Sequence, residues 1–219
     1  MVAFVLIPGA GGAGSYWSAV VPLLEEGGHE AVAVDLPGPD PRAGLAEYSD
    51  LVVAAARPYS EVVLVAQSLG GFTAPLAAER LPVRELVLVN AMIPVPGERP
   101  GEWWEATGSV PAREEAAERG GYGEFAPETY FLHDVDDPAL LGPPRDETDA
   151  VFGSRCEFTS WPSPIRVLAG ADDRLFPAQF QARIAQERLG VDADVLPGGH
   201  LIAMAQPQAV AHYLLRGAG

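Results

Sequence analysis

Three side chains that can act together in nucleophilic catalysis are spread along the sequence: Ser68, Asp173 and His200. A serine hydroxyl is a poor nucleophile at its own pKa, so it needs a histidine base, and the base needs a carboxylate to orient it. Where the serine lies on a strand-to-helix turn, the chain order is Ser, then Asp or Glu, then His. We therefore predict that Ser68 is the nucleophile, His200 its base and Asp173 the acid that orients the base.

The serine lies between an apolar stretch at 61–66 and a helical pattern at 72–80. It is flanked two residues away by Ala66 and Gly70, and small residues at these positions let the chain double back. Such a turn also points the first amides of the helix, with their partial positive charge, at a reacting carbonyl. An ordinary strand-to-helix turn is the alternative, but the placement between strand and helix favours a nucleophile.

The base and the acid are each chosen from several candidates. His29 lies in a glycine turn, His133 in a proline-rich stretch and His212 in a helical pattern, whereas His200 follows the last apolar strand. Two carboxylates follow the strand at 165–169. We prefer Asp173 because the stretch resembles a Gly-x-x-Asp-x-x-x-Pro pattern of known hydrolases in which this Asp is the acid, and we expect Asp172 to cap the turn or to face solvent.

The glycine-rich loop at 8–14 has two interpretations. It fits G-x-G-x-x-G, and Asp35 follows about 20 residues later, as in dinucleotide-binding proteins. Against this, bulky Tyr16 and Trp17 lie where a pyrophosphate would pack, and the three catalytic candidates stay unexplained. In a hydrolase the glycines let an amide approach a developing oxyanion, so we predict that the backbone N–H groups of Ala10 and Leu69 form an oxyanion hole.

These residues need a scaffold, and the apolar pattern predicts a mainly parallel sheet with helices on both faces. The expected strands are 3–7, 31–35, 61–66, 85–90, 165–169 and 192–196, and the expected helices are 16–26, 43–57, 69–80, 178–188 and 202–215. Right-handed connections would then place the carboxyl ends of the strands on one edge.

The alternation of strands and helices breaks between 92 and 164, so we divide the chain into a core, 1–91 and 165–219, and an inserted lid or cap, 92–164. We expect short helices near 110–119 and 145–153 within it. Half of the aromatic residues lie in this stretch, which favours a lid over an apolar pocket. The alternative is a surface subdomain with its own small core. The predicted pocket residues are Trp17, Trp103, Trp104, Tyr130 and His133.

The composition limits the classes of partner that this protein is expected to bind. The formal net charge of −16 argues against binding to nucleic acid. The basic residues are all arginine, which excludes mechanisms that need a lysine, and the single Cys156 excludes an intrachain disulfide. The apolar run at the N-terminus is too short for a signal peptide or a membrane span, so we expect a cytoplasmic protein without a membrane partner. We predict no cofactor and no metal, and leave the oligomeric state open, with a homodimer as one option.

Together these motifs resemble the α/β-hydrolase superfamily. The opening is similar to the plant methylesterase and hydroxynitrile lyase group, in the Pro-Gly-Ala around Ala10 and in other stretches at both ends of the chain: 16–17, 22–24, 28–29, 34–36 and 199–204. Two departures stand out. Pro8 replaces the histidine that the family usually carries before the oxyanion donor, and Leu201 replaces the lysine that holds cyanide in the lyases. The resemblance therefore implies the esterase branch, with a reduced sheet of about six strands.

The sequence thus predicts a serine hydrolase that cleaves a small, apolar carboxylic ester, thioester or lactone through an acyl-enzyme. The same three residues also support a lyase, a C–C bond hydrolase or a cofactor-free haloperoxidase. A ligand receptor on the same scaffold and a dinucleotide-binding oxidoreductase are further alternatives.

Overall fold

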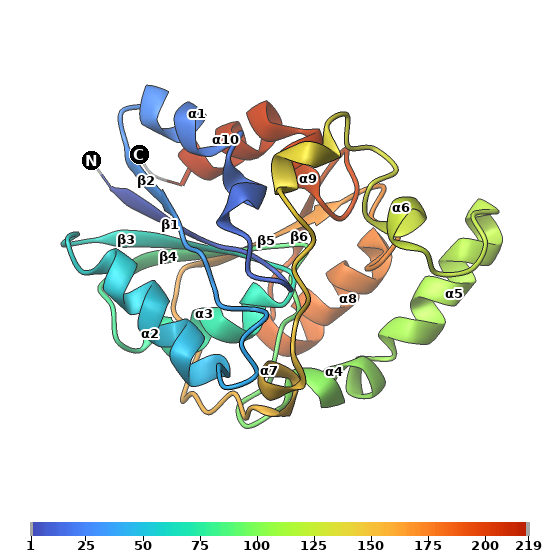
Figure 1. The fold of residues 1–219 in the computed structure, drawn as a ribbon, viewed down its shortest axis with the longest axis horizontal. Helices are drawn as coiled ribbons and strands as arrows, with labels where there is room; N and C mark the ends of the chain where they lie inside the picture. Colours follow the sequence, from blue (N-terminus) through green and yellow to red (C-terminus); the bar gives the residue numbers. More distant parts are fainter. Residues whose placement is uncertain (1, 218–219) are drawn as a thin grey trace.

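The computed structural model describes residues 2–217, and its centre is a single six-stranded parallel sheet (Figure 1). The strands run in the order β2-β1-β3-β4-β5-β6, and every neighbouring pair is parallel. Their bounds are β1 Ala3–Ile7, β2 Glu30–Ala33, β3 Val62–Gln67, β4 Val83–Val89, β5 Ile165–Gly170 and β6 Ala193–Leu196. The predicted fold class, a parallel α/β sheet of six strands, is confirmed.

Helices cover both faces of the sheet (Figure 1). Three helices pack on one face: α2 (Leu45–Ala56), α3 (Gly70–Ala78) and α8 (Ala178–Leu189). Four elements pack on the other: the 3-10 turn η1 (Gly14–Trp17), α1 (Val21–Glu26), α9 (Ile202–Ala205) and α10 (Pro207–Leu215). The expected helix at 202–215 is therefore two helices, because Pro207 has no N–H to continue the first one and starts the second.

Successive side chains of a strand point to opposite faces of the sheet. Because helices cover both faces, both sets of side chains are buried. Val5 and Leu64 belong to the core under α2, α3 and α8, whereas Leu6 and Val63 belong to the core under α1 and α10. This double burial explains why the strands read as continuous apolar runs without polar alternation.

Between β4 and β5 the chain leaves the sheet and forms five elements: α4 (Pro100–Thr107), α5 (Ser109–Gly120), α6 (Pro127–Tyr130), η2 (Pro138–Leu141) and α7 (Asp149–Gly153). The helices expected near 110–119 and 145–153 correspond to α5 and α7. The other three were not anticipated, although Pro100, Pro127 and Pro138 stand at helix starts, where proline is favoured.

Part of this inserted segment shares the core of the sheet. Trp103, Val151 and Cys156 are fully buried in the same cluster as the strands and α8. The Trp103 indole N–H donates to the Ile93 carbonyl at 3.1 Å, and the Cys156 thiol donates to the Phe72 carbonyl of α3 at 3.2 Å. Burial raises the pKa of the Cys156 thiol, which suits a packing role.

We predict that Trp103→Ala lowers the free energy of unfolding by about 3–5 kcal/mol, since it opens a cavity in the main core. Urea unfolding followed by circular dichroism measures this. The matched control is Trp104→Ala in the same helix, whose side chain is only partly buried and which should cost less. If the Trp103 variant unfolded at the wild-type midpoint, the inserted segment would be an independent unit rather than part of the core.

Candidate active site

Ser68 lies directly between β3 and α3, in a backbone conformation that few residues other than glycine adopt. Its φ is +50°, in the left-handed region. The surrounding turn holds it there: the Ser68 N–H donates to Val89, and its carbonyl accepts from Gly71 at 3.0 Å and Met92 at 2.9 Å. Such strain persists only where neighbouring structure enforces it, and it lifts the serine hydroxyl above the sheet edge.

Two glycines let the chain pass very close to this serine. A Cβ on Gly70 would lie 2.6 Å from the Pro8 carbonyl oxygen, and one on Gly9 would lie 2.8 Å from the Ser68 Cβ. Real Cβ atoms do not approach so closely, so both positions need glycine. The glycine-rich loop after β1 consequently packs directly against the serine turn.

The three predicted catalytic side chains lie in one hydrogen-bonded series. His200 Nε2 is 3.1 Å from Ser68 Oγ, and His200 Nδ1 is 2.8 Å from Asp173 Oδ2. All three residues are at least nine-tenths buried. The imidazole packs between the rings of Phe131 and Phe176, with centroids 5.4 and 5.2 Å away, so its orientation is fixed by packing as well as by hydrogen bonds.

The structure brings Asp173, and not Asp172, to the histidine. The second oxygen of Asp173 accepts the backbone N–H groups of Leu175 and Phe176, each at 2.9 Å, which stabilises the charged carboxylate in its buried position. Asp172 is exposed and accepts the N–H of Gly198 at 3.0 Å. It therefore braces the loop that carries His200.

Asn90, at the end of β4, is a site residue that the sequence analysis missed. Its amide nitrogen donates to the carbonyls of Gly199 and His200 at 2.9 and 3.0 Å, and its oxygen accepts the Gly170 N–H at 2.7 Å. It thereby ties the histidine loop to the end of β5. Its φ is +46°, and Asn is among the few residues that tolerate this region. The one signal in the sequence is a polar residue closing a buried apolar strand.

Gln181 of α8, also missed, supports the acid. Its amide nitrogen lies 3.2 Å from Asp173 Oδ2, 3.2 Å from Asn90 Oδ1 and 2.6 Å from the Phe176 carbonyl. The side chain is buried beneath the loop that carries Asp173. A glutamine in an amphipathic helix gives no sign of such a role before the fold is known.

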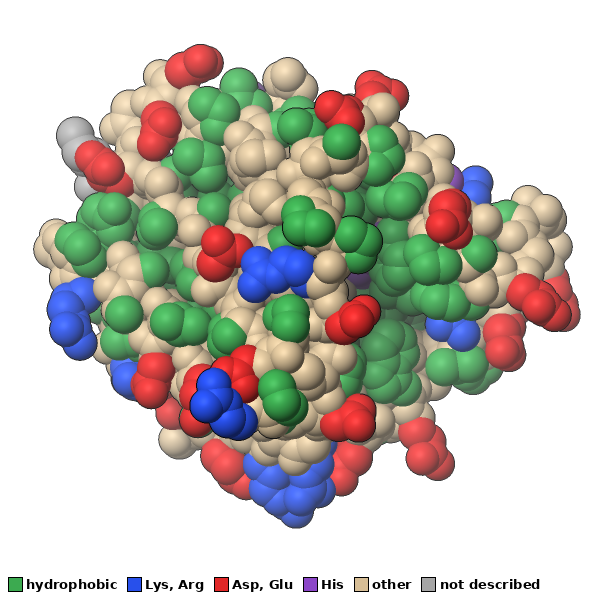
Figure 2. All heavy atoms as spheres, viewed as in Figure 1, with side chains coloured by type: hydrophobic (Ala, Val, Ile, Leu, Met, Phe, Trp, Pro, Cys, Tyr) green, Lys and Arg blue, Asp and Glu red, His purple; other side chains and the backbone are tan. Residues whose placement is uncertain are grey.

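Ser68 and His200 line a cavity of about 640 Å³. Figure 2 shows hydrophobic side chains around a hollow on this face of the molecule. Residues of the inserted segment form most of the wall. The lining residues are Ala10, Gly11, Ala13, Gln67, Ser68, Leu69, Met92, Trp104, Arg113, Phe125, Pro127, Phe131, Leu132, Pro138, Leu141, Gly142, Pro143, Pro144, Arg145, Leu175, His200 and Leu201. The apolar surface suits a hydrophobic ligand.

The structure describes all five of the predicted pocket residues, and of these five only Trp104 lines this cavity. The prediction for Trp17 and Trp103 is wrong, because both indoles are fully buried in the two cores. Tyr130 is also buried and lies behind the wall, where its ring contacts cavity-lining Phe125 at 5.1 Å and its hydroxyl donates to the Gly123 carbonyl. An aromatic-rich segment therefore supplies both core and wall, and composition does not separate the two.

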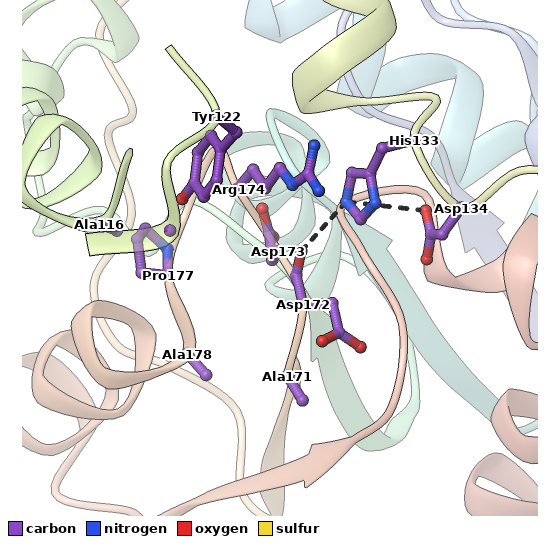
Figure 3. Close-up of a pocket in the computed structure, with 11 residues that line it drawn as sticks. Ala116, Tyr122, His133, Asp134, Ala171, Asp172, Asp173, Arg174, Pro177 and Ala178 are labelled. Atoms are coloured by element: carbon purple, nitrogen blue, oxygen red, sulfur yellow. Dashed lines mark hydrogen bonds and ion pairs between the residues drawn. The ribbon is translucent and has the colours of Figure 1, made fainter. Parts of the chain in front are cut away.

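His133 lies in a different cavity, of about 470 Å³, shown in Figure 3 with Arg174 and Tyr122 on its other side. Its Nε2 is 3.1 Å from the Asp172 carbonyl oxygen, and the neighbouring Asp134 accepts the Gly199 N–H at 2.6 Å. The prediction that His133 lines the substrate pocket is therefore corrected. This pair joins the inserted segment to the loops that carry Asp173 and His200.

The glycine-rich loop is occupied by carboxylates of the protein itself. The Gly14 N–H donates to Asp35 at 2.9 Å and the Gly11 N–H to Glu147 at 3.0 Å. A pyrophosphate on these amides would meet two negative side chains, which argues against the dinucleotide interpretation. The backbone N–H groups of Ala10 and Leu69 donate to no such partner among the described residues, and both residues line the cavity beside Ser68.

Metal-binding groups and membrane-spanning helices are both absent from residues 2–217. No group of three or more His, Cys, Asp or Glu side chains in this range is arranged to hold a metal ion. None of the helices found there combines the length and the apolar character that a membrane crossing needs.

Known proteins share both the sequence pattern and the architecture. The family model described as "Alpha/beta hydrolase family" matches residues 4–213. Probable esterase PIR7A of Oryza sativa subsp. indica is 37% identical over 110 residues, and Alpha-hydroxynitrile lyase of Arabidopsis thaliana is 37% identical over 103 residues. The match to the rice esterase covers 45% of this chain and 42% of the relative. The match to the Arabidopsis lyase covers 42% of this chain and 40% of the relative, so the chain spans less than half the length of either protein.

Solved structures align over the whole chain. The crystal structure of polyneuridine aldehyde esterase has a TM-score of 0.71 at 22% identity and covers 100% of both chains. The methylesterase MES16 from Arabidopsis has a TM-score of 0.76 at 19% identity, covering 100% of this chain and 99% of its own. At these identities the likeness concerns the fold. With the family model matching nearly the full length, the chain belongs to the alpha/beta hydrolase family.

Proposed function

We propose that this protein is a serine hydrolase that cleaves a small, apolar carboxylic ester through an acyl-enzyme. One observation carries the proposal: the hydrogen-bonded series from Ser68 through His200 to Asp173 ends in an apolar cavity. A hydroxyl, an imidazole and a carboxylate in this order form a nucleophile, its base and the group that orients the base.

The proposed reaction has two stages. Ser68 Oγ attacks the ester carbonyl while its proton passes to His200 Nε2, and the carboxylate of Asp173 stabilises the imidazolium that forms. The imidazolium then protonates the leaving alkoxide, which departs and leaves the acyl group on Ser68. In the second stage His200 takes a proton from water, hydroxide attacks the acyl carbonyl, and Ser68 recovers its proton as the acid leaves.

The amides of Ala10 and Leu69 are the proposed donors to the oxyanion. They are free of other acceptors among the described residues, they flank Ser68 in the cavity, and the Leu69 amide stands at the start of α3. A donor fixed in place before the reaction stabilises the negative charge as it develops, and one such donor is worth about 2.7–4 kcal/mol in the transition state.

The inserted segment, residues 92–164, acts in this proposal as a cap over the site. It supplies Trp104, Phe125 and Phe131 to the cavity wall and joins the two catalytic loops through His133 and Asp134. A wall of this kind removes water from around the ester and favours apolar acyl or alcohol groups.

A lyase on the same residues is the second candidate, and the similarity to an Arabidopsis hydroxynitrile lyase gives it a specific basis. Two features favour the esterase. Leu201, an apolar side chain, lines the cavity directly after His200, and the whole chain contains no lysine. Release of cyanide from mandelonitrile, with no turnover across a broad ester panel, would reverse this preference.

We predict that wild type hydrolyses p-nitrophenyl acetate and butyrate and that Ser68→Ala lowers kcat by about 10⁴-fold or more, because the nucleophile is lost. Nitrophenolate release measures both rates. A fluorophosphonate should label wild type and leave the variant unlabelled. Equal rates for the two proteins would show that Ser68 is not the nucleophile.

The two neighbouring aspartates give a matched pair. Asp173→Asn should lower kcat by about 10⁴-fold with little change in KM, since the amide holds His200 in the wrong tautomer. Asp172→Asn removes the same charge one residue away but faces solvent, and it should stay within about tenfold of wild type. Comparable losses in both variants, measured on p-nitrophenyl butyrate, would contradict the assignment of the acid.

A further inference from the structure

The cavity that holds Ser68 differs in charge from the rest of the protein. The chain carries a formal net charge of −16. Yet the described residues that line this cavity include two arginines, Arg113 and Arg145, and no aspartate or glutamate. A positively charged cleft attracts anions even when the protein that carries it has a negative net charge.

The guanidinium of Arg145 forms hydrogen bonds within the protein. One terminal nitrogen donates to Asp35 at 2.9 Å, and the other donates to the Leu36 carbonyl at 2.7 Å. These contacts join the inserted segment to the loop after β2. The charge of Arg145 is therefore balanced, and its donors are in use.

Arg113, on α5, forms no comparable hydrogen bond with a carboxylate or a carbonyl of the described residues. Its guanidinium carbon lies 5.2 Å from the ring centroid of Phe125 and 5.9 Å from that of Tyr130. Within residues 2–217 no carboxylate forms an ion pair with it, although Glu114 and Glu115 follow it in the helix. Aromatic rings hold a guanidinium by its flat face, which leaves the N–H groups at its edge free to donate.

We propose that Arg113 determines specificity by binding a carboxylate at the end of the substrate remote from the scissile ester. This inference rests on the proposed function and narrows it to anionic esters with an apolar middle, such as half-esters of dicarboxylic acids. The fork of Arg113 matches a carboxylate in two parallel hydrogen bonds. The apolar side chains of the same cavity, among them Phe125 and Phe131, cover the carbon chain in between.

Matched ester pairs test this. The p-nitrophenyl half-ester of glutaric acid and p-nitrophenyl valerate have the same chain length and differ in a terminal carboxylate. A second pair, p-acetoxybenzoate and p-tolyl acetate, places the anion on the leaving group instead. The quantity measured is kcat/KM for wild type, Arg113→Gln, Arg113→Lys and a control, Arg119→Gln, which removes the same charge from α5 at an exposed residue that pairs with Glu115.

In at least one pair, Arg113→Gln should lower kcat/KM for the anionic ester by about tenfold or more, because a charge-assisted hydrogen bond to the substrate is lost. The neutral ester should stay within about twofold. Arg113→Lys should recover part of the loss, since it keeps the charge without the fork. Arg119→Gln should change both esters by less than about twofold, as expected of a screened surface charge.

Two results would overturn the inference while leaving the proposed function intact. In the first, Arg113→Gln hydrolyses all four esters as wild type does. In the second, it loses the same factor on charged and neutral esters, so that Arg113 supports the aromatic wall and binds no anion. If Ser68→Ala still cleaved the valerate, or if wild type cleaved none of the four, the proposed function itself would fail, and this inference with it.

Discussion

The site depends on the parallel sheet, because the carboxyl ends of its strands meet at one edge. Ser68 follows β3, Asp173 follows β5 and His200 follows β6, so three residues far apart in sequence reach one point without long loops. β4 lies between β3 and β5 in the sheet, and its end supplies Asn90. This side chain bonds to the end of β5 and to the histidine loop, which fixes the spacing that proton transfer needs.

Burial and polar satisfaction work together around this edge. The carboxylate of Asp173 is removed from water, yet backbone amides and Gln181 supply hydrogen bonds in place of the lost solvent. In such surroundings the attraction between the carboxylate and an imidazolium is stronger than in water. The inserted segment completes the enclosure: both of its ends are part of the main core, through residues such as Trp103 and Cys156, and the stretch between them contributes most of the cavity wall. One segment therefore serves both stability and binding.

Residue type and strand position were enough to predict the serine turn and the histidine, whereas the choice of Asp173 over Asp172 needed the resemblance to a known hydrolase pattern. These signals are local, and parallel pairing converts them into proximity. The wall of the cavity could not be read in the same way, since the adjacent Trp103 and Trp104 lie in the core and in the wall respectively, and nothing in the sequence distinguishes them. Asn90 and Arg113 were missed because their roles depend on the order of strands and on which rings lie nearby. Both are properties of the folded chain.

In the proposed mechanism, an acyl group resides on Ser68 during turnover. Rapid mixing of the enzyme with excess p-nitrophenyl butyrate, acid quenching within the first turnover and peptide mapping by mass spectrometry measure this directly. We expect a burst of nitrophenolate equal to the enzyme concentration and a butyryl group on the peptide that contains Ser68. Turnover at the full rate with the acyl group on another residue, or on no residue after quenching in the first turnover, would contradict an acyl-enzyme on Ser68.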